Sequence, residues 1–341
     1  MKALLLKDIS KFEYTDVETP LPGPGEIQMN VKACSICGSD VHGYDGSSGR
    51  RIPPMIMGHE ASGVVSAVGE GVTKFKVGDK IVFNSGWYCR DCYQCKHGLA
   101  NVCDNGCCYG VQTEDYGRPG ALCEYIIVPE YIVYNMPDHM SFPEGALIEP
   151  LAIACHGIGG VNIGINDTAV IFGAGVIGLM LLKVLKTSSC GKVYVVELDE
   201  VKKKMAEANG GIVIDGREDV PAKIKELTGG IGADFAIEAV GISATVNNAL
   251  ACLKKGGTLV QVGNVSKKVD LPIQTVVMNE LKIVGRYCTS TEYETAIALI
   301  ANGKVDVSDC ISVVAPLQDG QQWFDRLHAA EPGLVKVVLE P

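Results

Sequence analysis

The sequence predicts a mixed α/β protein in which a β-rich, barrel-like domain precedes a doubly wound parallel sheet with helices on both faces. Its 341 residues suit two domains rather than one. Before about residue 150, short segments alternate polar and apolar residues between glycine-containing turns. After about residue 155, apolar runs of strand length alternate with helical patterns, which is typical of a parallel sheet.

The first part contains signals for several short strands. Residues 26–33 alternate polar and apolar side chains, which is the period of a strand with one buried face. Residues 63–68 and 80–83 are further runs rich in β-branched residues, and Gly-Glu-Gly and Val-Gly-Asp turns separate them. Short strands with closely spaced turns predict a barrel or a sandwich-like domain.

The second part predicts five strands with helices or glycine-rich connectors between them. One helical stretch ends at Lys186, and another covers residues 200–209. This alternation predicts a parallel sheet covered by helices. The predicted strands cover residues 169–172, 193–196, 212–214, 233–237 and 258–262.

A glycine-rich turn follows the first of these strands and opens a helix. Gly173, Gly175 and Gly178 form a G-x-G-x-x-G motif, whose glycines allow a tight turn, close approach of a pyrophosphate, and close helix packing. Glu197 lies nineteen positions after Gly178, directly after the second strand. A carboxylate there favours NAD and repels the extra phosphate of NADP. Asp199 is a second acid near this position, but it lies beyond the end of the strand and is the weaker candidate. Alternatively, the glycines only form a packed turn and Glu197 is a solvated surface acid. The combination of strand, glycines, helix and acid favours an NAD-binding site instead.

Four cysteines lie close together in the β-rich part, with the spacing C-x2-C-x2-C-x7-C. Four thiolates at this spacing can surround one tetrahedral ion, which is typical of structural zinc. Disulfides would need an oxidising compartment, and a ferredoxin-type cluster has a tighter spacing that ends in proline. Cys107 and Cys108 are spare thiols nearby. The predicted ligands are Cys89, Cys92, Cys95 and Cys103.

A second group of candidate ligands is spread along the same part. It includes a Cys37-Gly-Ser39-Asp-Val-His42 run, the Gly-His59-Glu60 segment, and Glu149 before a proline. Thiolate, imidazole and carboxylate together suit a catalytic zinc with a vacant position. Taken singly, Cys37 could be a buried thiol and His59 a core histidine.

In this combination and order, these motifs make the whole chain similar to the medium-chain zinc-dependent alcohol dehydrogenase family. The match is closest to the sorbitol (polyol) dehydrogenase branch. The resemblance implies a GroES-like catalytic domain with the structural-zinc lobe at residues 1–152, a Rossmann NAD-binding domain at 153–288, and a return to the catalytic domain at 289–341. It also implies two zinc ions per chain, one catalytic and one structural, with NAD as the cofactor.

The resemblance assigns roles residue by residue. Cys37, His59 and Glu60 become ligands of the catalytic zinc, and Ser39 and His42 become a proton relay. Simple alcohol dehydrogenases have a cysteine at the position of Glu149, which is a catalytic carboxylate here. Three alternatives stay open: Glu149 binds the zinc directly, binds it through a water molecule, or exchanges with Glu60 as a ligand. The expected cofactor-binding residues are Gly173, Gly175, Val176, Ile177, Gly178, Glu197, Lys202, Val262 and Gly263.

Three further residues are expected to contact the substrate. Arg286 and Tyr287 match the substrate-facing segment of polyol dehydrogenases, where they could hydrogen-bond several hydroxyl groups. The alternative is a surface arginine and a packed phenol. The polyol branch has an aromatic residue shortly after the relay histidine, and here Gly43 occupies that place. Tyr44, the next residue, is therefore the third expected substrate contact.

Composition excludes several other classes of protein. The net charge is −10 and the pI is near 5.2, which argues against nucleic acid or an anionic membrane as the main partner. The N-terminal apolar run is too short for a signal peptide, and no uncharged stretch reaches the length of a membrane span. We expect a cytoplasmic homodimer or homotetramer that acts on a small molecule.

These observations predict a dehydrogenase that uses zinc and NAD to oxidise a secondary alcohol of a polyol or sugar alcohol, phosphorylated or not, to a ketone. A threonine or short-chain diol substrate is the alternative within the family. An NAD(H)-binding protein without turnover is the alternative from another class. The joint presence of Cys37, His59, Glu60, Ser39 and His42 argues against that last alternative.

Overall fold

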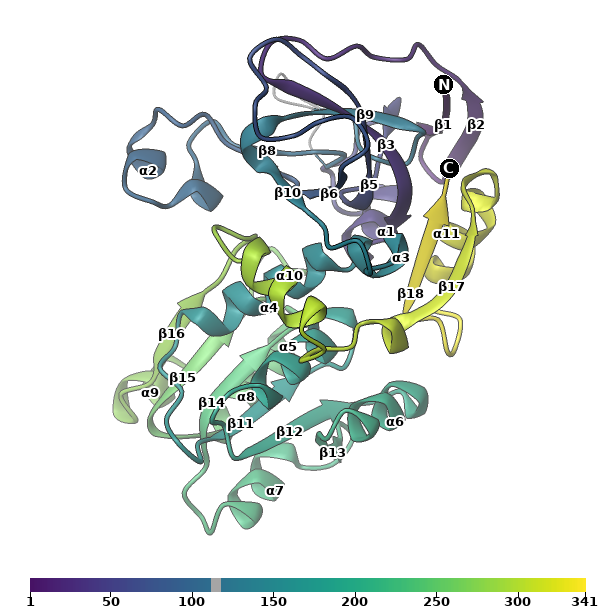
Figure 1. Ribbon diagram of the computed structural model, residues 1–341. Coiled ribbons are helices and arrows are strands. Elements are labelled where there is room, and N and C mark those ends of the chain that lie inside the picture. Colours follow the sequence, from purple (N-terminus) through teal and green to yellow (C-terminus); the bar gives the residue numbers. More distant parts are fainter. Residues whose placement is uncertain (112–117) are drawn as a thin grey trace. The chain divides into compact units, whose positions relative to one another are not determined.

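The computed structural model of the protein describes residues 1–111 and 118–341 (Figure 1). The chain forms two compact units, and α4 (Ile148–Gly159) begins in the first and ends in the second. The first unit contains residues 1–152 and 289–341, and the second contains residues 153–288. Among the described helices, none combines the length and the apolar character that crossing a bilayer requires.

The first unit is rich in short strands. Its strands are β1 (Lys2–Asp8), β2 (Lys11–Asp16), β3 (Glu26–Ser35), β4 (Met55–Ile56), β5 (Glu60–Val68), β6 (Lys80–Phe83), β7 (Gly86–Trp87), β8 (Cys107–Cys108), β9 (Tyr125–Pro129), β10 (Val133–Asn135), β17 (Ile311–Pro316) and β18 (Lys336–Glu340). Its helices are α1 (Gly38–Tyr44), α2 (Tyr93–Lys96), α3 (Phe142–Ala146), α10 (Tyr293–Ala301) and α11 (Gly320–His328). Among the described residues of this unit, short 3₁₀ turns are η1 (Ala100–Val102), η2 (Glu130–Ile132), η3 (Ser308–Cys310) and η4 (Leu317–Asp319).

Strand β3 organises the largest sheet of this unit. The strand order is β10-β6-β5-β3-β18-β17, and β9 also pairs with β3. The pairs that β3 makes with β5, β9 and β18 are antiparallel, so residues from both ends of the chain meet beside this one strand. Its burial pattern, with Ile27, Met29 and Val31 nearly inaccessible, shows that β3 runs through the core.

The second unit is built on one parallel sheet of order β13-β12-β11-β14-β15-β16. Its elements are β11 (Thr168–Phe172), α5 (Val176–Lys186), β12 (Lys192–Glu197), α6 (Glu200–Ala208), β13 (Ile212–Asp215), α7 (Val220–Leu227), β14 (Ala233–Glu238), α8 (Ser243–Cys252), β15 (Leu253–Gln261), α9 (Ile273–Met278) and β16 (Lys282–Gly285). Strand order reverses beside β11, which is where doubly wound sheets bind dinucleotides.

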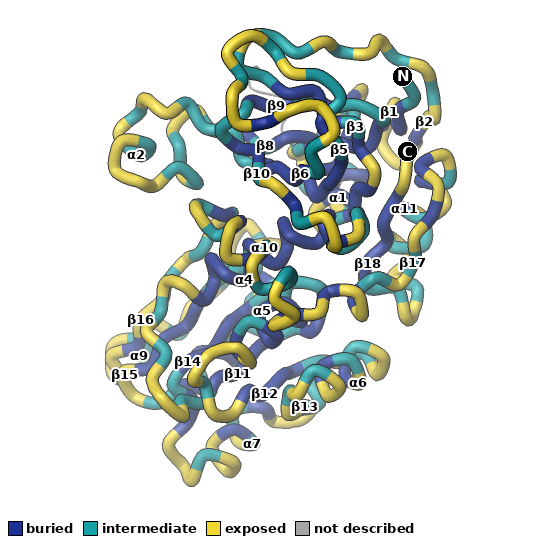
Figure 2. Tube along the Cα trace, viewed as in Figure 1, coloured by how far each residue is buried: buried dark blue, intermediate teal, exposed yellow. Residues whose placement is uncertain are grey.

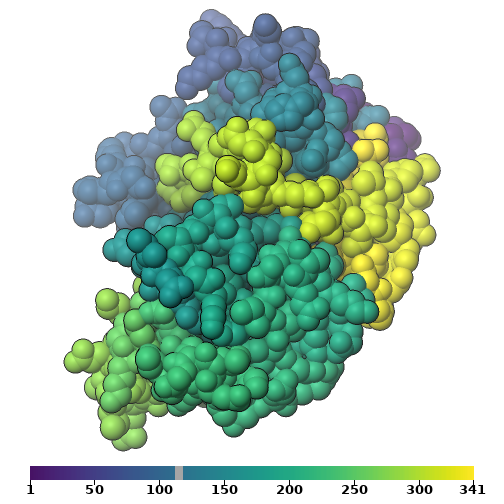
Figure 3. All heavy atoms as spheres, turned by 60° about the horizontal axis from the view of Figure 1, so that its bottom comes forward, coloured from purple at the N-terminus to yellow at the C-terminus, as the bar shows by residue number. Residues whose placement is uncertain are grey.

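Burial follows the expected pattern of such a sheet. The central strands β11 and β14 are dark blue in Figure 2, while the connecting turns are largely exposed. In Figure 3 the light-green atoms of the part of the chain that includes α9 lie at the edge of the view, and Val277 and Met278 of this helix are exposed.

The predicted fold class is confirmed. Each strand predicted in the second part lies in the six-stranded sheet, with bounds that differ by a few residues at most except at β15, which starts at Leu253 rather than at 258. The sequence analysis missed β16, since Lys282–Gly285 has only four residues and little hydrophobic contrast with its surroundings.

Candidate active site and metal centres

The four cysteines predicted to bind structural zinc converge in space. The sulfur atoms of Cys89, Cys92, Cys95 and Cys103 all lie within 4.8 Å of one another. The Sγ–Sγ distances are 3.7 Å for Cys92–Cys103 and 3.5 Å for Cys89–Cys103. A tetrahedron with Zn–S bonds of about 2.3 Å has edges of about 3.8 Å, so this set fits zinc. Cys107 and Cys108 do not belong to the group.

Backbone amides prepare this group for a cation. The N–H groups of Asp91 and Cys92 donate to Sγ of Cys89, and they lower the pKa of that thiol to about 6. Burial, followed by the neighbouring thiols, raises the pKa of Cys95 to about 12. Four thiolates cannot crowd together stably without a positive charge among them, which a metal ion supplies.

The second predicted metal group also forms. Cys37 caps the N-terminus of α1, and His59 and Glu60 lie where β5 begins. One ligand atom from each of the three residues lies within 4.8 Å of the others. A sulfur, a nitrogen and an oxygen leave one position of a tetrahedron open, which is the arrangement of catalytic zinc.

Strand register explains why Glu60 is not an isolated buried charge. Ser35 of β3 lies opposite Glu60 on one side and opposite Val338 of β18 on the other. Lys336, two residues before Val338, therefore reaches the same face, and its Nζ lies 2.5 Å from Oε2 of Glu60. The Ser35 hydroxyl donates to the same carboxylate. The charges of Glu60 and Cys37 outweigh the effect of burial and raise the pKa of Lys336.

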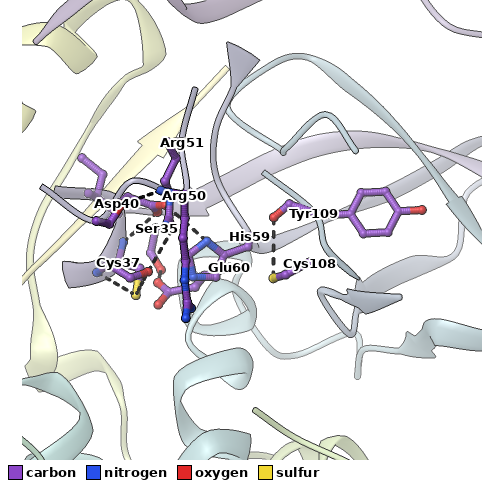
Figure 4. A network of polar contacts seen from close by, with 12 residues as sticks. Ser35, Cys37, Asp40, Arg50, Arg51, His59, Glu60, Cys108 and Tyr109 are labelled. Atoms are coloured by element: carbon purple, nitrogen blue, oxygen red, sulfur yellow. Dashed lines mark hydrogen bonds and ion pairs between the residues drawn. The ribbon is translucent and has the colours of Figure 1, made fainter. Parts of the chain in front are cut away.

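Asp40 supports the histidine ligand. Its Oδ1 lies 3.4 Å from Nδ1 of His59 and 2.7 Å from Nη2 of Arg51, and its Oδ2 accepts from the backbone N–H of Cys37. Figure 4 shows Asp40, Arg51 and His59 pointing toward one another from three segments. Burial opposes ionisation of Asp40, but the charges of His59 and Arg51 hold its pKa well below the usual range. A carboxylate in this place orients a ligating imidazole.

Glu149 does not join the three convergent ligand atoms. It lies in the first turn of α4 with 9% of its surface exposed. Burial first, and then the charge of Glu60, raise the pKa of Glu149 to about 7. The described conformation therefore offers three protein ligands rather than four, and direct binding of zinc by Glu149 stays a prediction.

The two residues of the expected proton relay lie on α1. The Ser39 hydroxyl is 3.2 Å from Sγ of Cys37, so it lies directly beside the metal group. Ser39 and His42 are both exposed. The Ser39 hydroxyl is hydrogen-bonded to the ligand sulfur, and the exposed His42 imidazole lies on the same helix. This arrangement is compatible with proton transfer from the metal group toward solvent.

In the second unit, the glycine motif has the geometry of a phosphate-binding turn. Gly173 has φ +93°, and a Cβ on Gly178 would lie 1.8 Å from the carbonyl oxygen of Gly173. A Cβ on Gly175 would meet nothing within 4 Å, and this residue caps α5 without a side-chain hydrogen bond. The N–H groups that begin α5, at Val176 and Ile177, are thus open to a pyrophosphate.

Glu197 ends β12 beside this turn. Its Oε2 accepts from the N–H of Ala174 at 2.7 Å, so the carboxylate is tied directly to the glycine-rich turn. Its Oε1 accepts from Leu198 and Asp199. Lys202 follows in the first part of α6, where its N–H bonds to the Asp199 cap. The structure thus brings the predicted ribose-binding carboxylate next to the glycine-rich turn, and its contact with a ribose stays a prediction.

A buried carboxylate that the sequence analysis missed holds the loops at the ends of β14 and β15. Glu238 is inaccessible to solvent, and it accepts hydrogen bonds from the N–H groups of Val240 and Gly241 and from the Thr245 hydroxyl. The Gln261 amide also donates to it. The predicted cofactor residues Val262 and Gly263 donate their N–H groups to its backbone carbonyl. Glu238 therefore fixes two loops at the cofactor edge of the sheet.

Comparison with known proteins agrees with both sites. Residues 23–138 match the family model of the alcohol dehydrogenase GroES-like domain, and residues 176–302 match that of zinc-binding dehydrogenases. D-xylulose reductase A of Aspergillus niger is 34% identical over 340 residues, which cover 96% of this chain and 94% of the relative. The chain belongs to the medium-chain zinc-dependent alcohol dehydrogenase family.

Solved structures of this family share the fold. The alcohol dehydrogenase TADH from Thermus sp. ATN1 matches with a TM-score of 0.94 at 26% identity, over 100% of this chain and 99% of that one. The 2R,3R-butanediol dehydrogenase of Bacillus subtilis matches with a TM-score of 0.88 at 29% identity, over the same shares. The protein is thus a zinc-dependent NAD(P) oxidoreductase that acts on CH–OH groups, as the sequence predicted.

The structure corrects one predicted substrate residue of this dehydrogenase. Tyr44 is 2% exposed, and its ring lies 5.4 Å from those of Phe12 and Phe324. Its hydroxyl lies within hydrogen-bonding distance of the Ser10 carbonyl oxygen and of Oδ1 of Asp325. The prediction that Tyr44 contacts the substrate is wrong, because the next position on α1 after Gly43 faces the core rather than the metal group.

Arg286 and Tyr287 lie just after β16. Nε of Arg286 donates to the carbonyl oxygen of His156 at 2.8 Å, near the C-terminus of α4, and its Nη2 lies 3.2 Å from Nδ1 of His156. A cation at a helix C-terminus stabilises the last carbonyl groups. Arg286 therefore has a structural partner, and Tyr287 is 44% exposed. Their contact with substrate stays a prediction.

Proposed function

We propose that the protein is an NAD-preferring dehydrogenase that reversibly oxidises a secondary alcohol of a polyol or sugar alcohol, phosphorylated or not, to a ketone. The observation that carries this proposal is the convergence of Cys37, His59 and Glu60 beside the Ser39 hydroxyl. The polyol class is supported by the similarity to a D-xylulose reductase over nearly the whole chain.

In this proposal each chain holds two zinc ions. The four cysteines hold a structural ion, and Cys37, His59 and Glu60 hold a catalytic one. When bound, the catalytic zinc supplies a Lewis acid for the substrate hydroxyl, and NAD supplies the hydride acceptor. Ser39 accepts the substrate's proton, and His42 passes it toward solvent. Lys336 keeps Glu60 charge-compensated, and Asp40 keeps the His59 ring in place.

The preference for NAD rests on Glu197. Its carboxylate accepts from the N–H of Ala174 in the glycine-rich turn and from the N–H groups of Leu198 and Asp199, which supports a role beside the adenosine ribose. The 2′-phosphate of NADP would meet this negative charge. A carboxylate therefore selects the free ribose hydroxyls.

Substrate class is tested by steady-state turnover of the wild-type protein with NAD. The panel contains xylitol, sorbitol, a sugar-alcohol phosphate, 2,3-butanediol and threonine. The proposal expects the highest kcat/KM with a polyol or its phosphate. A clear preference for threonine or for the short diol would contradict it, and the similarity to a butanediol dehydrogenase makes the diol the relevant competitor.

A further inference from the structure

A buried arginine lies directly behind the Ser39 hydroxyl. Arg51 is 3% exposed, and its Nη2 lies 3.0 Å from Oγ of Ser39 and 2.7 Å from Oδ1 of Asp40. An arginine Nη2 carries two hydrogens and accepts none. One hydrogen therefore goes to the Asp40 carboxylate and the other to Ser39.

This arrangement restricts the direction of the Ser39 hydroxyl. A serine oxygen has two lone pairs and one hydrogen. Since Arg51 occupies one lone pair, the hydrogen of Ser39 must point elsewhere, and its nearest partner is Sγ of Cys37 at 3.2 Å. The second lone pair is left for a proton that arrives from the substrate.

The space for Arg51 depends on Gly43. A Cβ on Gly43 would lie 2.1 Å from Cδ of Arg51, so any larger residue at this position would displace the arginine. The aromatic residue that the polyol branch carries near this place is absent here. The glycine and the buried arginine thus form one feature of this chain.

We propose that Arg51 is a positioning residue for the proton relay: its guanidinium holds the Ser39 hydroxyl so that Ser39 accepts the substrate's proton and releases its own outward. This inference rests on the proposed function. In the step, the substrate O–H bond breaks as a new Ser39 O–H bond forms. The original Ser39 O–H bond, which points to Sγ of Cys37 before the reaction, turns away from the sulfur and breaks as its proton moves toward His42 and solvent, so Ser39 ends neutral. The guanidinium offsets negative charge on Oγ whenever the second transfer precedes the first.

The test is a double-mutant cycle of Arg51→Met with Ser39→Ala. Alone, Arg51→Met is expected to lower kcat about ten-fold, the effect of losing one charge-assisted hydrogen bond. The KM for NAD and the zinc content should stay at wild-type values. In the Ser39→Ala background, Arg51→Met should change kcat by less than about two-fold, because the group through which it acts is gone.

Arg326→Met is the matched control, since Arg326 also pairs with a carboxylate, that of Glu331, but is far more exposed. It should leave kcat unchanged. If the methionine variant does not fold, Arg51→Lys replaces it, because lysine keeps a positive charge beside Asp40. Its kcat is then measured with and without Ser39→Ala.

Three results would overturn the role of Arg51 while leaving the dehydrogenase intact. These are full activity of Arg51→Met, an equal loss of kcat in the Ser39→Ala background, or loss of the catalytic zinc from the Arg51 variants. The last would show that the guanidinium acts through Asp40 and His59. Full activity of Ser39→Ala would instead end the relay itself.

Discussion

The two metal-binding groups of this dehydrogenase are built in opposite ways. The four-cysteine group comes from fifteen consecutive positions, Cys89 to Cys103, and its cysteines are partly exposed. The Cys37–His59–Glu60 group draws its ligands from two segments, and its supporting charges from α1, β18 and the turn before β4. His59, Glu60, Asp40 and Lys336 are all buried.

This difference shows what each site requires of the fold. Backbone amides of the local loop stabilise the thiolate of Cys89, and all four sulfur atoms come from one short segment, so this group needs little beyond the metal and that segment. The catalytic group needs the complete β5-β3-β18 arrangement, because Glu60 would otherwise be a buried charge without a partner. Loss of one site should therefore leave the other intact.

The largest effect is expected from His59→Ala. This change removes one of three convergent ligands and leaves Asp40 without its imidazole partner. Turnover should fall by roughly a thousand-fold or more, since a Lewis acid lowers the activation barrier by several kcal/mol. Zinc analysis should find one ion per chain, and NAD binding should persist. Retention of both ions would remove His59 from the ligand set.

Breaking the ion pair beneath Glu60 should affect stability strongly. Lys336→Met leaves a buried carboxylate without its ammonium partner, a change that costs about 3 kcal/mol or more. Thermal unfolding should therefore occur several degrees lower. Lys2→Met is the matched control, because Lys2 pairs with Asp16 on the exposed surface and its loss should not move the melting temperature. Equal melting of the two variants would show that the Glu60 pair is not a structural requirement.

Opening the four-cysteine group should give the converse of the His59 variant. Cys92→Ser removes one thiolate from a closed shell, so the structural ion should be lost, and with it thermal stability and the integrity of any oligomer. The folded fraction should still contain the catalytic ion and turn over substrate. An unchanged zinc content and melting temperature would contradict the structural assignment.

The smallest effect concerns the cofactor. Glu197→Ala should narrow the preference for NAD over NADP by about ten-fold, because it removes one charge near the position of the 2′-phosphate. The measurement is kcat/KM for both cofactors. Glu200→Ala, which removes an exposed carboxylate in the first turn of α6, should leave the ratio unchanged. An equal kcat/KM of the wild type for NAD and NADP would show that Glu197 does not select between the two cofactors.

The comparison also explains what could be predicted from the sequence. Contiguous motifs, such as the cysteine run and the glycine-rich turn with Glu197, were found because their geometry is local. Lys336 was missed, since nothing in a C-terminal strand shows that it pairs beside β3 some three hundred residues earlier. Its only signal was a lysine within an apolar run. Tyr44 was misplaced because sequence gives the spacing from His42 but not the direction in which α1 faces the core.

The most direct test of the two-site account is zinc analysis of the purified wild-type protein during graded chelation, with activity and melting temperature followed together. The account predicts two zinc ions per chain. One ion should be removed with a parallel loss of turnover while the melting temperature stays high, and loss of the other should then bring unfolding. Two results would contradict the two-site account. One is a single zinc ion per chain in the fully active protein, and the other is a loss of activity that does not parallel the release of either ion.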